Sequence, residues 1–107
     1  MAVFTRINAE TAHELWQQGQ ARFADIRDAR SYAAGHIPGA VHLTDATLAD
    51  FLQDVEDDQP VVVVCYHGNS SQGAADYLCH QGLETVSSLD GGFTAWGQQF
   101  PDAVESN

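Results

Sequence analysis

The amino-acid sequence predicts one α/β domain in which helices cover both faces of a parallel sheet. Short β-like runs alternate with helical ones along the chain of 107 residues, which is the pattern of such a sheet. The clearest run is Pro-Val-Val-Val-Val at residues 60–64, where successive β-branched residues without polar alternation indicate a strand buried on both faces. The length and a hydrophobic content of 44% fit one core, so we expect residues 1–107 to form a single domain.

The segments ahead of this central strand alternate between the two kinds of structure. Strands are expected at residues 4–7, 22–26 and 41–43. The helix after the first of these strands carries Thr11 and Glu14 in the spacing of a capping box. Two further helices are expected at residues 30–34 and 47–52. The acidic run at residues 54–58 indicates a solvated loop.

The segments after the central strand continue the alternation. A helix, a strand and a last helix are expected at residues 71–81, 85–89 and 92–99. Leu78 and Cys79 lie on the apolar face of the first of these helices, and Pro101 prevents the second from continuing. Residues 102–107 are expected to be frayed.

The charge of the chain excludes several classes of partner. It has 15 acidic residues against four Lys and Arg residues, all of them Arg, and a formal net charge of −11. Nucleic-acid binding depends on basic side chains that neutralise phosphates, and so does adsorption to anionic lipid, so we expect neither. The simplest interpretation of this acidic surface is solubility, and a dedicated basic partner is the alternative.

Neither a membrane span nor a secretory signal is expected. No apolar run approaches about 18 residues, the length at which a segment becomes a candidate span. Residues 1–20 contain Glu10 and Glu14 and lack a continuous apolar stretch. The expected location is therefore the cytoplasm.

The two cysteines are not expected to form a disulfide. If a helix starts near Ser70, Cys79 lies roughly 13 Å along its axis at 1.5 Å per residue. A disulfide needs Cα atoms within about 7 Å of each other. Two reduced thiols in a reducing compartment are the better interpretation, with Cys79 acting as apolar packing.

Cys65 stands where chemistry is expected, because it follows the central strand directly and precedes a helix. Ligands of parallel sheets bind beyond the carboxyl ends of strands, and a helix N-terminus favours thiolate over thiol. Gly68 allows a tight turn in which successive amides point inward as an anion nest. The loop residues expected to bind substrate are Tyr66, His67, Gly68, Asn69 and Ser70. Ser70 and Ser71 also supply hydroxyl donors, and either one can cap the helix.

Such a loop suits a cysteine that carries sulfur. Attack by the Cys65 thiolate on a sulfane sulfur would form a persulfide and expel an anion. A second nucleophile would then collect the sulfur, giving two half-reactions in ping-pong order. The alternative for Cys65 is inert packing, while His67 is either a cation facing an anionic substrate or a solvated loop residue.

No metal site or cofactor is expected. The five histidines are scattered, and neither a Cys-x-x-Cys nor a His-x-x-x-His spacing occurs.

Several motifs in order along the chain resemble those of the rhodanese family. Asp-Ile-Arg at residues 25–27, followed by Tyr32 and Gly-His-Ile-Pro-Gly-Ala at residues 35–40, resembles the N-terminal signature of that family. Gly-Gly-Phe-x-x-Trp at residues 91–96 resembles its C-terminal signature, and Cys65 opens a loop of rhodanese length. The pattern covers residues from about 4 to 100 and is similar to single-domain thiosulfate sulfurtransferases.

This resemblance implies a five-stranded parallel sheet flanked by helices. It also implies thiosulfate as the sulfur donor, cyanide as a laboratory acceptor, and thioredoxin or another small dithiol as the physiological kind of acceptor. Cys65 would hold the persulfide, and the amides of residues 66–70 would cradle its sulfur. Many single-domain members have Arg where this chain has Ser70, so weaker affinity for a dianion is expected.

The N-terminal motif is expected to be structural. Asp25 and Arg27 indicate an ion pair that holds the fold, and residues 35–40 supply turn residues with a proline-restricted bend. His36 and His42 are then structural histidines.

The C-terminal motif is also expected to be packing. The glycines at 91 and 92 let the chain turn tightly into the last helix, while Phe93 and Trp96 share its core-facing side.

Two other functions compete with sulfur transfer. A cysteine phosphatase or arsenate reductase also places a thiolate before a helix, but it needs a bidentate Arg at the position that Ser71 holds here. A rhodanese-like module kept only for binding would not need Cys65. A sulfur carrier that works with one dedicated protein stays open beside a free-standing enzyme.

Overall fold

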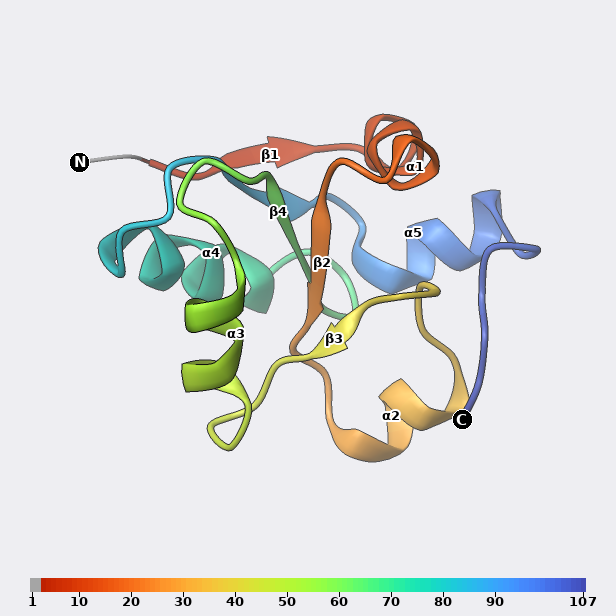
Figure 1. The fold of residues 1–107 in the computed structure, drawn as a ribbon. Coiled ribbons are helices and arrows are strands. Elements are labelled where there is room, and N and C mark those ends of the chain that lie inside the picture. Colours follow the sequence, from red (N-terminus) through yellow and green to blue (C-terminus); the bar gives the residue numbers. More distant parts are fainter. Residues whose placement is uncertain (1–2) are drawn as a thin grey trace.

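The computed structural model describes residues 3–107 and alternates strands with helices throughout (Figure 1). The elements follow in the order β1 (Thr5–Ile7), α1 (Ala9–Gln18), β2 (Arg22–Asp25), α2 (Ala29–Ala34), β3 (Val41–His42), α3 (Leu48–Asp54), β4 (Val61–Val64), α4 (Ser70–His80), β5 (Val86–Leu89) and α5 (Gly92–Gln99).

The strands form one five-stranded sheet in the order β1-β5-β4-β2-β3, and every pair is parallel. This confirms the predicted fold class. β4 lies in the middle of the sheet, where Val63 is in register with Ala24 of β2 and with Ser88 of β5. A strand paired on both edges and covered on both faces must be apolar throughout, which explains the run of valines.

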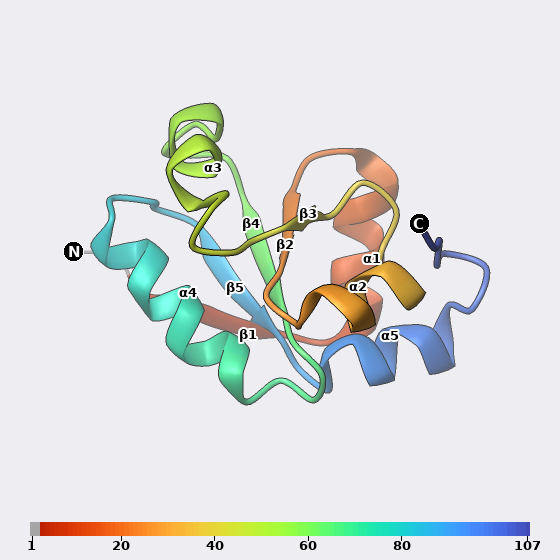
Figure 2. The ribbon, with the colours of Figure 1, turned by 90° about the horizontal axis from the view of Figure 1, so that it is seen from below.

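The valines of β4 supply both cores in alternation. Val62 and Val64 pack with Phe23 and Trp96 on the side that α1 and α5 cover. The neighbouring valines of β4 face Leu78 and the other apolar residues of α3 and α4. Figure 2 shows α3 and α4 on one side of the sheet, with α1, α2 and α5 on the other.

The predicted start of the first helix was wrong. Helix α1 begins at Ala9, and its N-cap is Asn8, whose Oδ1 accepts a hydrogen bond of 2.8 Å from the Thr11 amide. Thr11 therefore lies inside the first turn, because the asparagine ahead of it satisfies the free amide that a capping threonine would otherwise bind.

The acidic run is only partly a solvated loop. Asp54 is the last residue of α3 and pairs with Arg22 at 2.8 Å, and Val55 is buried. Asp54 is exposed although it is helical, and residues 56–58 form the exposed loop that was expected.

The prediction that residues 102–107 are frayed was also wrong. Ala103 is buried, and its carbonyl accepts a hydrogen bond of 2.7 Å from Trp96 Nε1. Further on, His36 and Glu105 form an antiparallel bridge with two backbone hydrogen bonds of 2.9 Å. The chain end therefore lies against the α2 region, as Figure 1 shows.

The predicted ion pair between Asp25 and Arg27 is confirmed and buried. Arg27 Nη2 lies 2.7 Å from Asp25 Oδ2 and also donates to the Gly35 carbonyl at 2.6 Å. The guanidinium stands over the Phe93 ring, 4.2 Å from its centroid. This pair thus joins β2, the end of α2 and helix α5.

His36 and His42 are structural, as predicted. Both imidazole rings stack on the Tyr32 ring, with centroids 4.0 Å and 4.7 Å from its centroid. His36 Nδ1 bonds the Tyr32 carbonyl and His42 Nε2 bonds the Arg27 carbonyl, both at 2.6 Å.

None of the helices in the described part of the chain is long and apolar enough to span a membrane.

Breaking the buried pair should destabilise the fold strongly. Arg27→Met would leave the Asp25 carboxylate buried without its partner, which costs about 3–5 kcal/mol of unfolding free energy. Arg6→Met removes the exposed pair with Asp90 and should cost less than about 1 kcal/mol. Urea unfolding of both variants measures the difference, and equal losses would contradict the role given to the buried pair.

Candidate active site

Cys65 is the first residue after β4, and it lies at the carboxyl edge of the sheet with only 4% of its surface exposed. The ladder between strands ends beside it, where the Ile26 amide donates to the Val64 carbonyl at 2.9 Å. Helix α4 begins at Ser70, so residues 66–69 must turn the chain within a short distance. The thiol is therefore enclosed by the turn that follows it.

The sulfur of Cys65 is surrounded by hydrogen-bond donors. The amides of Gly68 and Ser71 lie 3.1 Å and 3.3 Å from Sγ, and Ser71 Oγ lies 3.2 Å from it. When the sulfur is a thiolate, all of these groups can donate to it. The arrangement thus solvates a negative sulfur with neutral dipoles.

These contacts change the acidity of the thiol. Burial by itself raises the pKa of Cys65, but the hydrogen bond from the Ser71 hydroxyl and those from the amides of Ser71, Gly68 and His67 lower it further than burial raises it. The net pKa is below the ordinary value of a cysteine, so a larger share of Cys65 is the reactive thiolate at neutral pH.

Gly68 is required by the shape of the turn. Its φ is +91°, and a Cβ on it would lie 2.9 Å from the Gly91 amide nitrogen and 3.0 Å from the Leu89 carbonyl oxygen. Only glycine combines this left-handed conformation with such close approach of two backbones.

The carbonyls of the same turn are held from behind by helix α5. The Phe93 amide donates to the Cys65 carbonyl at 2.8 Å, and the Thr94 amide donates to the Tyr66 carbonyl at 3.1 Å. Figure 2 shows the chain between β4 and α4 beside the start of α5. Because the Tyr66 carbonyl points to α5, the His67 amide of the same peptide unit points away from α5, and this amide is one of those that lower the pKa of Cys65.

Gly92 allows α5 to come this close. A Cβ on Gly92 would lie 2.5 Å from the carbonyl oxygens of both Cys65 and Tyr66. The positive φ angles of Gly91 and Gly92 agree with the predicted tight turn into the helix. Sequence reasoning assigned this pair to packing and missed its contact with the Cys65 turn.

The loop residues expected to bind substrate lie in different environments. Gly68 is buried under the sulfur, whereas the side chains of Tyr66, His67, Asn69 and Ser70 are exposed around it. The amide of His67 contributes to the low pKa of Cys65, while its ring stands 6.4 Å from that of Tyr66.

Tyr66 ties the loop to the start of α2. Its hydroxyl donates to Asp28 Oδ1 and lies 2.8 Å from Ser31 Oγ. Hydrogen bonds from Tyr66 and Ser31 lower the pKa of Asp28 to about 2, so this tether is intact at neutral pH. Arg27 stands below the Tyr66 ring, with its Cζ 5.8 Å from the centroid.

Ser71 is a site residue that the sequence-based assignment omitted. The predicted capping of the helix by Ser70 or Ser71 is wrong, because α4 begins at Ser70 and its N-cap is Asn69. Ser71 is instead fully buried and contacts Cys65 Sγ through both its amide and its hydroxyl. The available signal was its place in the first turn of α4, where side chains point back toward the preceding loop. Gln72 supports the same turn, since its Nε2 donates to the Gly68 carbonyl at 2.8 Å.

Cys79 lies in α4 as expected, and neither cysteine forms a disulfide. Burial, with a smaller contribution from Asp76, raises the pKa of the Cys79 thiol. The pKa values of the two thiols are therefore shifted in opposite directions, and of the two only Cys65 is favoured as a thiolate. In residues 3–107, no three His, Cys, Asp or Glu side chains gather as metal ligands would.

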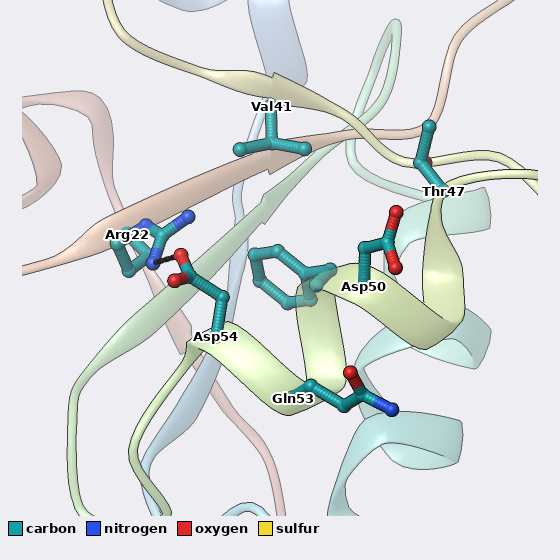
Figure 3. A pocket seen from close by; sticks show the side chains of 7 residues that line it. Arg22, Val41, Thr47, Asp50, Gln53 and Asp54 are labelled. Atoms are coloured by element: carbon teal, nitrogen blue, oxygen red, sulfur yellow. Dashed lines mark hydrogen bonds and ion pairs between the residues drawn. The ribbon is translucent and has the colours of Figure 1, made fainter.

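Two hollows in the surface of residues 3–107 have no cysteine in their lining. One hollow, between β2 and α3, has a volume of about 560 Å³. Figure 3 shows that Arg22 in this hollow is already paired with Asp54. None of its lining residues belongs to the Cys65 turn. A second hollow of about 410 Å³ is mainly apolar, and none of its lining residues belongs to the Cys65 turn either.

Comparison with known proteins identifies the family. The model of the rhodanese-like domain matches residues 8–99. The rhodanese-like domain of the Alr3790 protein from Anabaena sp. is 26% identical, with a TM-score of 0.80 over 95% of this chain and 79% of that one.

Other solved structures with this fold differ in their described function and in the length of the whole protein. A protein of unknown function from Rhodopseudomonas palustris, described as a possible tyrosine phosphatase, is 27% identical, with a TM-score of 0.76 over 90% of this chain and 81% of that one. Reduced CoADR-RHD from Bacillus anthracis is 24% identical, with a TM-score of 0.78 over 94% of this chain. This chain spans only 18% of the length of that protein.

The low pKa of Cys65 can be measured by alkylation. Iodoacetamide labelling of a Cys79→Ser variant should reach its half-maximal rate at a pH below about 8.5, the value of an unperturbed thiol. A Cys65→Ser variant, which retains only the buried Cys79, should label slowly across the same range. A Cys65 profile that follows a free thiol would show that the donors around the sulfur do not stabilise its thiolate.

Adding a side chain at Gly92 should disturb the turn. Gly92→Ala places a methyl group 2.5 Å from two carbonyl oxygens at a φ of +59°. We expect a loss of about 2–4 kcal/mol in unfolding free energy and a Cys65 labelling profile displaced toward higher pH. The matched control is Gly73→Ala in α4, where the methyl group meets no atom within 4 Å and should stabilise the helix by about 0.5–1 kcal/mol.

Proposed function

Since the chain belongs to the rhodanese family, which supports sulfurtransferase chemistry in general, we propose that it transfers sulfur from thiosulfate to a thiol acceptor through a persulfide on Cys65. The observation that carries this proposal is the sulfur of Cys65 at the end of β4, enclosed by neutral donors from Gly68 and Ser71. These three contacts come from neutral dipoles and therefore suit a sulfur that carries a single negative charge.

The first half-reaction loads the enzyme. The Cys65 thiolate attacks the outer sulfur of thiosulfate, and a new bond forms between Sγ and that sulfur. The S–S bond of thiosulfate breaks, and its electron pair leaves with sulfite. The amides of residues 66–70 surround the outer sulfur of the resulting persulfide anion.

The second half-reaction returns the enzyme to its starting state. A thiolate acceptor, such as that of thioredoxin or another small dithiol, attacks the outer sulfur. The persulfide S–S bond breaks, its electron pair returns to Cys65 Sγ, and the acceptor leaves as a persulfide. Cyanide replaces the thiol in a laboratory assay and leaves as thiocyanate. A free nucleophilic cysteine is compatible with a reducing compartment, and we propose the cytoplasm.

The lack of cations near the sulfur favours this chemistry over phosphate transfer. No Lys or Arg follows Cys65 in the sequence, whereas a phosphatase loop needs a guanidinium for the phosphate oxygens. Arg27 is close to Tyr66, but its charge is already paired with Asp25. The same lack of charge, with Ser70 in the place of Arg, lowers the affinity expected for the thiosulfate dianion.

Mass spectrometry of the intact protein tests the proposal. Incubation with thiosulfate should add the mass of one sulfur atom to the wild-type chain and to Cys79→Ser, and cyanide should remove it as thiocyanate. Cys65→Ser should gain nothing, because its hydroxyl cannot form a persulfide.

Two outcomes would contradict the proposal. An equal mass gain in Cys65→Ser would exclude Cys65 as the carrier. Hydrolysis of an aryl phosphate without sulfur transfer would indicate a phosphatase instead.

A further inference from the structure

Ser88 is a buried hydroxyl placed behind the active-site serine. It lies in β5 with no exposed surface, and its Oγ is 2.7 Å from Ser71 Oγ. Within residues 3–107, Ser71 is the one side chain or backbone group found in hydrogen-bond contact with that oxygen. The hydroxyls of Ser88 and Ser71 and the sulfur of Cys65 therefore form a short chain.

The burial of Ser88 gives this chain a preferred direction. If Ser71 donated to Ser88, the Ser88 proton would be left without a partner in a dry site, which is costly. If Ser88 donates to Ser71, its proton is satisfied. Ser71 must then direct its own proton elsewhere, and the Sγ of Cys65, 3.2 Å away, can accept it once the thiol has lost the proton that it otherwise donates to Ser71.

We propose that Ser88 is a positioning residue of the active site, because it orients the Ser71 hydroxyl as a donor to Cys65 Sγ. Ser88 does not touch the sulfur itself. It acts through Ser71, and its effect is to stabilise negative charge on the sulfur.

The consequence for catalysis rests on the proposed function. Cys65 is the nucleophile of the first half-reaction and the leaving group of the second. A donor to Sγ makes the thiolate a better leaving group and a somewhat weaker nucleophile per thiolate. Loss of Ser88 should therefore slow discharge of the persulfide to an acceptor and should not slow its formation once Cys65 is fully ionised.

Alkylation of Cys65 and a double-mutant cycle test the chain of hydroxyls. Ser88→Ala should shift the labelling midpoint upward by about half to one pH unit. It should also slow persulfide discharge about fivefold, which is the factor expected from the loss of one hydrogen bond. In a Ser71→Ala background the further change Ser88→Ala should have no effect, since the intermediate hydroxyl is gone. The control is Ser87→Ala on the same strand, whose hydroxyl bonds Thr5 Oγ1 instead and which should leave both measurements unchanged.

A second comparison separates the hydroxyl from the shape of the side chain. The side chains introduced by Ser88→Thr and Ser88→Val have nearly the same size, but only that of threonine carries a hydroxyl. We expect threonine to retain the low labelling midpoint and valine to lose it, with thermal unfolding measured for every variant.

The outcomes for Ser88 and for the proposed function are distinguishable. Identical labelling profiles for wild type and Ser88→Ala, or additive effects of the two serine changes, would overturn the role of Ser88 even if sulfur transfer proceeds. If labelling shifts as expected but wild-type protein takes no sulfur from thiosulfate, the positioning role stands and the proposed function fails.

Discussion

The structure of the site depends on the hydrogen bonds between the start of α5 and the turn that carries Cys65. The amides of Phe93 and Thr94 bind the carbonyls of Cys65 and Tyr66. In each trans peptide unit the carbonyl and the amide point to opposite sides. Because the Tyr66 carbonyl points to α5, the His67 amide of the same peptide unit points the other way and contributes to the low pKa of Cys65, while the amides of Gly68 and Ser71 contact the sulfur. A cluster of donors then exists without any charged side chain.

The rest of the fold holds α5 in that position. Trp96 is fully buried between α1 and β2, and its indole bonds the carbonyl of Ala103 in the chain end. Phe93 lies under the guanidinium of Arg27, which Asp25 fixes from the end of β2. Features that look like ordinary packing are therefore linked through α5 to the backbone of the reactive cysteine.

The features that could be predicted from the sequence are those that depend on residues close together in the chain. The valines of β4, the position of Cys65 after them and the need for glycine at 68 follow from local patterns. The bond between Ser71 and Ser88 joins residues 17 positions apart, and the contact of Gly92 with Cys65 joins the start of α5 to the turn after β4. Such pairs become neighbours only when β4 and β5 lie side by side. The bridge between Glu105 and His36 likewise joins residues far apart in the sequence, so no local pattern predicts it.

The dipoles of nearby amides and a hydroxyl can stabilise a thiolate even in an acidic chain, because they act over short distances. The formal net charge of −11 disfavours a further negative charge on the protein. A single surface cation would offset this, but it would attract any anion and not only the one at Sγ. Amides and a hydroxyl within 3.3 Å of Sγ stabilise charge at that one atom and are little affected by the distant carboxylates. Burial of Cys65 strengthens these contacts by excluding water, although by itself it disfavours the thiolate. The donors must therefore be numerous and well oriented, and this requirement explains why a buried serine of β5 stands behind the serine that touches the sulfur.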